Sequence, residues 1–191
     1  MNLYLRLLLT LIFGVRRERL APHQESNSSF RVLPHDIDVF GHMNNGRYLQ
    51  IMDVARVQWM LQAGVLRAMR VSRWGATLGG NLIRYRHALK LFRRYVVRTR
   101  LVHWNERWFF FEHAFIDGDG RTVATGLSRA ALRDRQGWVS TDVVVGAVAP
   151  GACTPPMPDA VTRWLAADQT LERCQARCDT QPTSPSLEHA S

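Results

Sequence analysis

The sequence has few cysteines. Cys153, Cys174 and Cys178 are the whole set, and all three lie in the C-terminal quarter of the 191 residues. An odd number without a second pair argues against a disulfide framework. Cys174-x-x-x-Cys178 lacks both the spacing and the partner ligands of a structural zinc site. We therefore expect reduced thiols, no metal site and no bound cofactor.

The sequence also lacks a long uninterrupted apolar run. Residues 1–14 (MNLYLRLLLTLIFG) are mostly apolar but contain Arg6, whereas spanning a bilayer takes roughly 20 apolar residues. An arginine cluster at 16–19 follows this run, and a secretory signal would carry its positive charge before it. Two interpretations of residues 1–19 stay open: a helix at the membrane interface, or a helix that caps the domain.

Acidic residues are outnumbered. Asp and Glu number 16 against 25 Lys and Arg, which gives a formal net charge of +9. This balance favours an anionic partner such as a nucleotide, a nucleic acid or a lipid surface. The length is that of one ordinary domain with short extensions.

One long helix is predicted after residue 44. Apolar residues recur there at steps of three and four, and further apolar residues fill most of the remaining positions up to Gly64. A helix that is apolar around most of its circumference is buried. Asn44 or Asn45 is suited to cap its start.

After the helix, the repeat of the apolar residues changes from about 3.6 residues to 2. This alternation predicts antiparallel strands joined by short turns. The expected architecture is α+β, with an antiparallel sheet of about five strands wrapped around the one long buried helix. We expect strands at 30–33, 82–87, 96–103, 109–116 and 121–132, with a polar linker at 22–29 and a short helix and loop at 65–80.

The main domain is expected at 28–148. A C-terminal extension at 149–168 follows, with a short helix at 159–167, and residues 169–191 are predicted to be a disordered tail because they are rich in Gln, Thr, Ser and Pro.

The segment HDIDVFGHMNNGRY, residues 35–48, is rich in groups that carry chemistry. It places Asp38 close to the start of the buried helix, where backbone N–H groups lack intrahelical partners and the helix dipole favours negative charge. A carboxylate beside such a site can attack a carbonyl or activate water, while the N–H groups stabilise the oxyanion.

The pattern Asp36-x-Asp38-x-x-Gly41-His42-x-Asn44-Asn45-x-x-Tyr48, followed by a buried helix and four long strands, resembles the hotdog-fold thioesterases of the 4-hydroxybenzoyl-CoA thioesterase-like superfamily. The chain looks closest to the branch similar to thioesterase superfamily member 6, whose members also begin with an apolar segment. The resemblance covers residues 28–148.

The resemblance implies roles for individual residues. Asp38 would be the nucleophile or general base, the amide at Asn45 would polarise the thioester carbonyl, and His42 lies where plant acyl-carrier thioesterases place a histidine. Those enzymes have an asparagine where this chain has Phe40, so the chain departs from their catalytic Asp-Asn-His set at this position.

The resemblance also implies homodimers, or dimers of dimers, that bind acyl-CoA or an acyl-carrier-protein thioester at the subunit interface. The predicted substrate-binding residues are Gly41, Asn44, Arg84, Arg86, Lys90, Arg93 and Arg94, and the basic ones would contact the nucleotide phosphates.

Structural interpretations stand beside these roles. Asp36 is expected to bond loop amides, Asp38 could form an Asx turn, and His42 could orient the loop through a backbone carbonyl. Residues 84–104 alternate basic and apolar side chains as a half-solvated sheet requires, so we expect no nucleic acid partner.

The favoured function is hydrolysis of an acyl-CoA or carrier-protein thioester by a cytoplasmic protein, with peripheral membrane contact through residues 1–19 as an additional hypothesis. The alternatives are a hydratase or dehydratase on the same fold, and a non-catalytic, membrane-associated binder of acyl-CoA or lipid.

Overall fold

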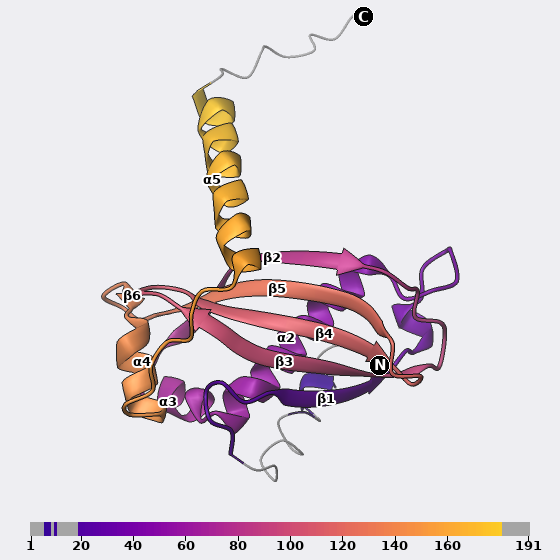
Figure 1. Ribbon diagram of the computed structural model, residues 1–191, viewed down its shortest axis with the longest axis horizontal. Coiled ribbons are helices and arrows are strands. Elements are labelled where there is room, and N and C mark those ends of the chain that lie inside the picture. Colours follow the sequence, from indigo (N-terminus) through magenta and orange to yellow (C-terminus); the bar gives the residue numbers. More distant parts are fainter. Residues whose placement is uncertain (1–5, 9, 11–18, 181–191) are drawn as a thin grey trace, which may run out of the picture. The chain divides into compact units, whose positions relative to one another are not determined.

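The computed structural model describes residues 6–8, 10 and 19–180. It divides into two units, residues 1–157 and 158–191, which we describe separately. The first unit is built on an antiparallel sheet with strand order β1-β3-β4-β5-β2, and a short β6 also pairs with β5 (Figure 1). The strands are β1 (Ser26–Arg31), β2 (Gly75–Tyr85), β3 (Arg94–Trp104), β4 (Phe109–Asp117), β5 (Thr122–Arg133) and β6 (Trp138–Val139).

The helix α2 (Asn45–Gln62) runs across one face of this sheet (Figure 1). Its buried side chains point in most directions around the axis, as predicted for a helix wrapped by other elements. Gly126 of β5 allows the close approach, because a Cβ there would lie only 3.0 Å from the Sδ and Cε atoms of Met52. The structure confirms the predicted α+β hotdog architecture, in which an antiparallel sheet wraps around one buried helix.

The core under α2 has two parts. One part surrounds the first half of the helix and contains Tyr48, Ile51, Tyr95 and Phe115. The second part surrounds Trp59 in the second half of the helix and includes side chains from β3, β4, β5 and the later helices. These helices are α3 (Val65–Ser72) and α4 (Thr141–Val148). The first part lies next to the polar motif, and the second lies further along the helix.

Two segments that the sequence predicts to be loops belong to strands in the structure. The sequence predicts a polar linker at 22–29, but β1 already begins at Ser26, whose buried hydroxyl donates to Gln62 of α2 at 2.5 Å. The Ser26 hydroxyl can be buried here because Gln62 of the helix offers it a partner. Residues 75–80 were expected in a loop, but they open β2, since backbone pairing with β5 requires no large side chain. His87 lies beyond the end of β2.

The C-terminal helix is longer than the sequence predicts. We expect a helix at 159–167 and disorder from residue 169, whereas α5 runs from Asp159 to Thr180. The prediction of disorder is therefore wrong for 169–180, where Leu, Glu, Arg, Gln and Ala favour helix despite the polar composition. Residues 181–191 lie outside the described residues. Among the helices described, none is both long and apolar enough to cross a membrane.

Candidate functional site

The motif folds into a narrow hairpin-like loop before α2. A short 3-10 turn, η1 (Pro34–Asp36), leads into it, and Ile37 pairs with Met43 across its base. The backbone N–H of Asp38 donates to the carbonyl of His42 at 3.0 Å. Gly41 has φ of +80°, a conformation that other residues rarely adopt, so glycine serves the backbone here. At the tip, Val39 and Phe40 are 94% and 78% exposed.

The Asp38 carboxylate lies beside His42 in this loop. Its Oδ1 accepts a hydrogen bond from the backbone N–H of Phe40 at 2.9 Å and lies 3.7 Å from His42 Nδ1. The Asx turn that the sequence allowed is therefore present. An ionised carboxylate offers about four acceptor sites, and this side chain is 19% exposed, so it also retains acceptor capacity toward solvent. The carbonyl of His42 fixes the loop, while its ring stacks on Phe40.

Asn44 is the residue that caps α2. Its Oδ1 accepts from the N–H of Gly46 at 2.8 Å, and its carbonyl accepts from the N–H of Arg47 at 2.9 Å. Among the described residues, the N–H of Asn45 has no hydrogen-bond partner, although its carbonyl accepts from the Tyr85 hydroxyl at 3.0 Å. The positive end of the helix dipole thus carries one free backbone donor.

The contacts of Asp36 indicate that this residue stabilises the loop. Its side chain is fully buried, pairs with Arg6 at 2.5 Å and accepts from the N–H of Leu33 at 2.9 Å. Its backbone carbonyl accepts from the N–H of Asn44 at 2.8 Å, which ties η1 to the helix start. The predicted bond to a loop amide is confirmed. The Arg6 partner was missed, although an arginine interrupting an apolar run was a visible signal.

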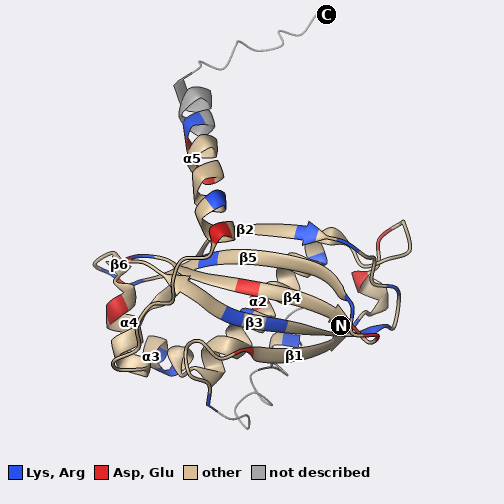
Figure 2. Cartoon of the chain, in the orientation of Figure 1, with Lys and Arg blue, Asp and Glu red and all other residues tan. Residues whose placement is uncertain are grey.

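The predicted phosphate-binding residues are all exposed but do not form one group. Lys90 pairs with His42 in an isolated β-bridge, which places it beside the motif. Arg84 and Arg86 flank Tyr85, whose hydroxyl reaches the helix start, and basic positions occur toward the end of β2 in Figure 2. Arg93 instead pairs with Asp119 at 3.4 Å, and Arg94 begins β3 opposite Arg31. Of these five residues, Lys90 is therefore the one whose contacts connect it to the motif, whereas Arg84 precedes Tyr85 in β2, where successive side chains point to opposite faces of the sheet.

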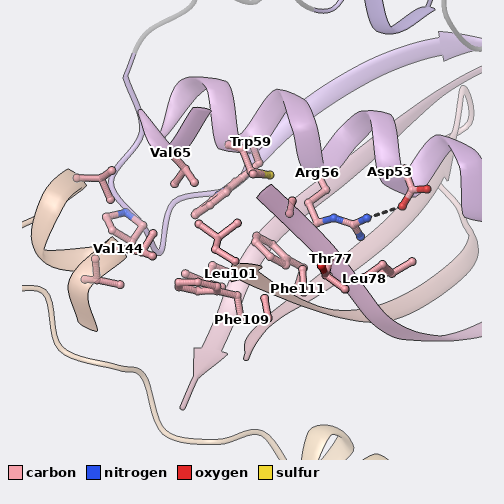
Figure 3. Close-up of a pocket in the computed structure, with 18 residues that line it drawn as sticks. Asp53, Arg56, Trp59, Val65, Thr77, Leu78, Leu101, Phe109, Phe111 and Val144 are labelled. Atoms are coloured by element: carbon pink, nitrogen blue, oxygen red, sulfur yellow. Dashed lines mark hydrogen bonds and ion pairs between the residues drawn. The ribbon is translucent and has the colours of Figure 1, made fainter. Parts of the chain in front are cut away.

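A separate apolar pocket of about 190 Å³ opens along the second half of α2. Asp53 and Arg56 line one end, as Figure 3 shows, and form an ion pair. The Arg56 guanidinium also donates to Ser128 Oγ at 3.0 Å, and Ser128 in turn lies 2.9 Å from Nε2 of the buried His113. Sequence reasoning missed this network; the visible signal was a histidine at an apolar position of β4.

Burial dominates the chemistry of His113. It lowers the pKa of the imidazole to about 3, and the nearby Arg56 cation acts in the same direction. His113 is therefore neutral at physiological pH. Among the residues that the structure describes, no group of three His, Cys, Asp or Glu side chains is arranged to hold a metal ion.

The fold and the motif agree with known proteins. Residues 32–165 match the family model of the thioesterase-like superfamily. Protein THEM6 from Xenopus laevis is 33% identical over 145 residues, which cover 74% of this chain and 68% of that protein. The chain belongs to the thioesterase-like superfamily, as the motif predicted.

Solved structures share the hotdog fold. A probable thioesterase from Escherichia coli superposes with a TM-score of 0.59 at 19% identity, covering 65% of this chain and 96% of that one. A Staphylococcus aureus protein solved in complex with CoA gives 0.60 at 12% identity, covering 75% and 96%. At these identities the likeness concerns the fold alone.

Proposed function

We propose that the protein hydrolyses acyl-CoA thioesters, with Asp38 as the catalytic carboxylate. The observation that carries this proposal is that one short loop holds the partly exposed Asp38 and leads directly into a helix whose first N–H, that of Asn45, is free of partners in the described chain. Membership of the thioesterase-like superfamily supports the reaction class.

In the proposed reaction, Asp38 removes a proton from water as the water oxygen attacks the thioester carbonyl. The carbonyl oxygen becomes an oxyanion and accepts a hydrogen bond from the Asn45 N–H at the positive end of α2. The tetrahedral intermediate then collapses, the C–S bond breaks, and the thiolate takes up the proton. One water and one thioester thus give one carboxylic acid and one thiol. Direct attack by Asp38 on the carbonyl is the other form of the same proposal.

His42 would support Asp38 in this proposal. At 3.7 Å its Nδ1 lies within ion-pair range of Asp38 Oδ1 but outside ordinary hydrogen-bond distance. Its role is therefore to orient the carboxylate through the loop, whose base its backbone carbonyl closes by accepting from the Asp38 N–H.

CoA is the thiol that we propose, because Lys90 lies beside the motif, and the exposed Arg84 and Arg86 near the end of β2 are further basic side chains that suit its phosphates. The CoA complex of the S. aureus protein supports the same choice.

A homodimer would complete the site. The exposed Val39 and Phe40 at the loop tip and Leu78 and Leu82 on β2 are apolar surfaces that a second copy could cover. The strand β2 stands at one end of the strand order, where pairing with a second sheet would remove an edge.

The test is thiol release from acyl-CoAs of short, long and aromatic acyl groups, measured for the purified protein and for Asp38→Asn. We expect turnover with at least one substrate and a loss of about 10²-fold or more in kcat for the variant, as for removal of a general base. The matched control is Asp119→Asn, which removes an exposed carboxylate in the hairpin between β4 and β5 and should keep full activity.

Two outcomes would count against the proposal. Full turnover by a folded Asp38→Asn protein would remove Asp38 from the mechanism. No thiol release from any acyl-CoA would exclude these substrates, and acyl-carrier-protein thioesters would then be the substrates to test.

A further inference from the structure

The apolar pocket along α2 has one polar end. Apolar side chains, including Trp59, Phe109 and Phe111, form its body, and Val144 of α4 lies at the end opposite Arg56 (Figure 3). The two residues that make the polar end, Asp53 and Arg56, begin eight positions after Asn45 in the helix, about 12 Å along its axis. The pocket is thus a second concave site, apart from the Asp38 loop.

Arg56 brings a buried positive charge to this pocket. Its side chain is only 10% exposed, and burial lowers the pKa of its guanidinium, with the Asp53 carboxylate opposing that shift. Arginine nevertheless stays protonated in proteins and carries five N–H donors. Among the described residues, Ser128 and Asp53 engage two of these donors. Donors therefore remain for an acceptor that enters the pocket.

A chain of buried polar groups holds the guanidinium in place. Arg56 donates to Ser128 Oγ, so the Ser128 hydroxyl is free to donate to His113 Nε2, and His113 Nδ1 then donates to Thr99 Oγ1 at 3.1 Å. This assignment gives each member a partner and uses the neutral imidazole. Such a network keeps the cation at the pocket wall rather than letting it swing out to solvent.

We propose that this pocket binds a small carboxylic acid, with its apolar group against the pocket walls that Trp59 and Phe111 help to form and its carboxylate on Arg56. The volume sets the size of the ligand: an apolar cavity of about 150 Å³ holds benzene, so about 190 Å³ suits a group of roughly six to eight carbons or one aromatic ring. The charge sets the head group, because arginine recognises carboxylates through paired N–H donors. This site does not depend on the proposed hydrolysis.

Asp53 is the residue that opposes such a ligand. Its carboxylate competes for the same guanidinium, yet it is 49% exposed and keeps its own hydration, so it can yield its place on Arg56. The proposal therefore makes an unusual prediction: removing this negative charge should strengthen carboxylate binding, whereas loss of a purely structural ion pair would not.

The test is calorimetric titration of the full-length protein, without any thioester, with octanoate, octanamide and octylamine. We expect octanoate to bind about tenfold or more tightly than either of the other two, as a charge-assisted hydrogen bond to Arg56 predicts. Equal binding of octanamide or octylamine would overturn the assignment of Arg56 as the carboxylate partner. No measurable binding of octanoate would overturn the site itself.

Variants locate the binding. Val144→Phe fills the end of the pocket opposite Arg56 and should weaken octanoate binding about tenfold or more, whereas Val143→Phe, next to it on α4 but exposed and outside the pocket, should bind as the wild type does. Ala130→Leu fills the pocket from β5 and replaces Val144→Phe if that variant melts early. Asp53→Asn should tighten octanoate binding several-fold. Unchanged binding in both filling variants would overturn the proposal.

Discussion

Asp36 and Asp38 are separated by one residue, yet the Asp36 side chain is fully buried against Arg6 while the Asp38 side chain is 19% exposed beside His42. A buried carboxylate paired with a buried cation belongs to the folding of the loop. A carboxylate that reaches solvent next to a helix start is able to act on a ligand. The two acids of one motif therefore serve stability and chemistry separately, and variants can separate them.

Asp36→Asn should lower the free energy of unfolding by about 3–5 kcal/mol, because it leaves the Arg6 cation buried without its charged partner. Urea unfolding of the wild type, Asp36→Asn and Asp38→Asn measures this. Asp38→Asn should change stability far less. The double variant Arg6→Met with Asp36→Leu should recover part of the loss, since it removes both charges together. An Asp36→Asn protein as stable as wild type would show that Arg6 does not depend on this partner.

His42→Gln should reduce kcat toward acyl-CoA by about tenfold, less than Asp38→Asn, because the imidazole acts on Asp38 from 3.7 Å rather than on the substrate. Glutamine keeps the backbone carbonyl that accepts from the Asp38 N–H. The split between kcat and KM, measured for both proteins, is the decisive readout, since a residue that positions Asp38 should change kcat and leave KM unchanged. A loss as large as that of Asp38→Asn would give His42 a direct catalytic role.

Stability should depend on His113 between about pH 6.5 and pH 3. Its pKa is lowered from 6.5 to about 3 in the folded protein, so in this range the unfolded chain binds a proton that the folded chain does not. The stabilisation from the neutral imidazole is fully present above pH 6.5 and is lost progressively as the pH falls toward 3.

Urea unfolding at pH 7 and pH 4.5 measures this dependence. His113→Gln, which keeps polar atoms near Thr99 and Ser128, should lose less stability over this interval than the wild type. The control His87→Gln, at an exposed position, should lose as much as the wild type. An equal slope in His113→Gln and wild type would show that His113 is not the titrating group.

Replacing Arg84 and Arg86 together by Gln should raise the KM for acyl-CoA several-fold and leave kcat unchanged, because the charges contact phosphate in both the ground state and the transition state. Higher salt should weaken wild-type binding more than that of the variant. Arg98→Gln is the matched control, since Arg98 is an exposed β3 arginine paired with Glu25. Equal KM values for wild type and the double variant would remove these residues from CoA binding.

The sequence predicts elements with strong periodicity well. The alternation of apolar and polar side chains in β3, β4 and β5 indicates a sheet with one face on the core. The apolar positions of α2 indicate that this helix is buried on nearly all sides. Weak periodicity explains the failures. The hydroxyl-rich start of β1 and the glycine-rich start of β2 carry no apolar signal, because backbone pairing and bonds to α2 hold them in the sheet.

Some features of the candidate site could likewise be predicted from the sequence, and others could not. The motif itself, its cap Asn44 and the turn at Gly41 were readable because each depends on contacts between residues close in sequence. The connection of Lys90 to His42 and the diversion of Arg93 to Asp119 were not, since the loop between β2 and β3 decides them.

The sequence by itself determined the family, the buried helix with its antiparallel strands, and the loop that presents Asp38, because local periodicity and a dense local motif record them. Only the tertiary structure decided which acid is buried and where the pocket opens. The deciding pairs, Arg6 with Asp36 and Arg56 with Ser128, join residues 30 and 72 positions apart, and a partner at that distance is chosen by the packing of the whole core.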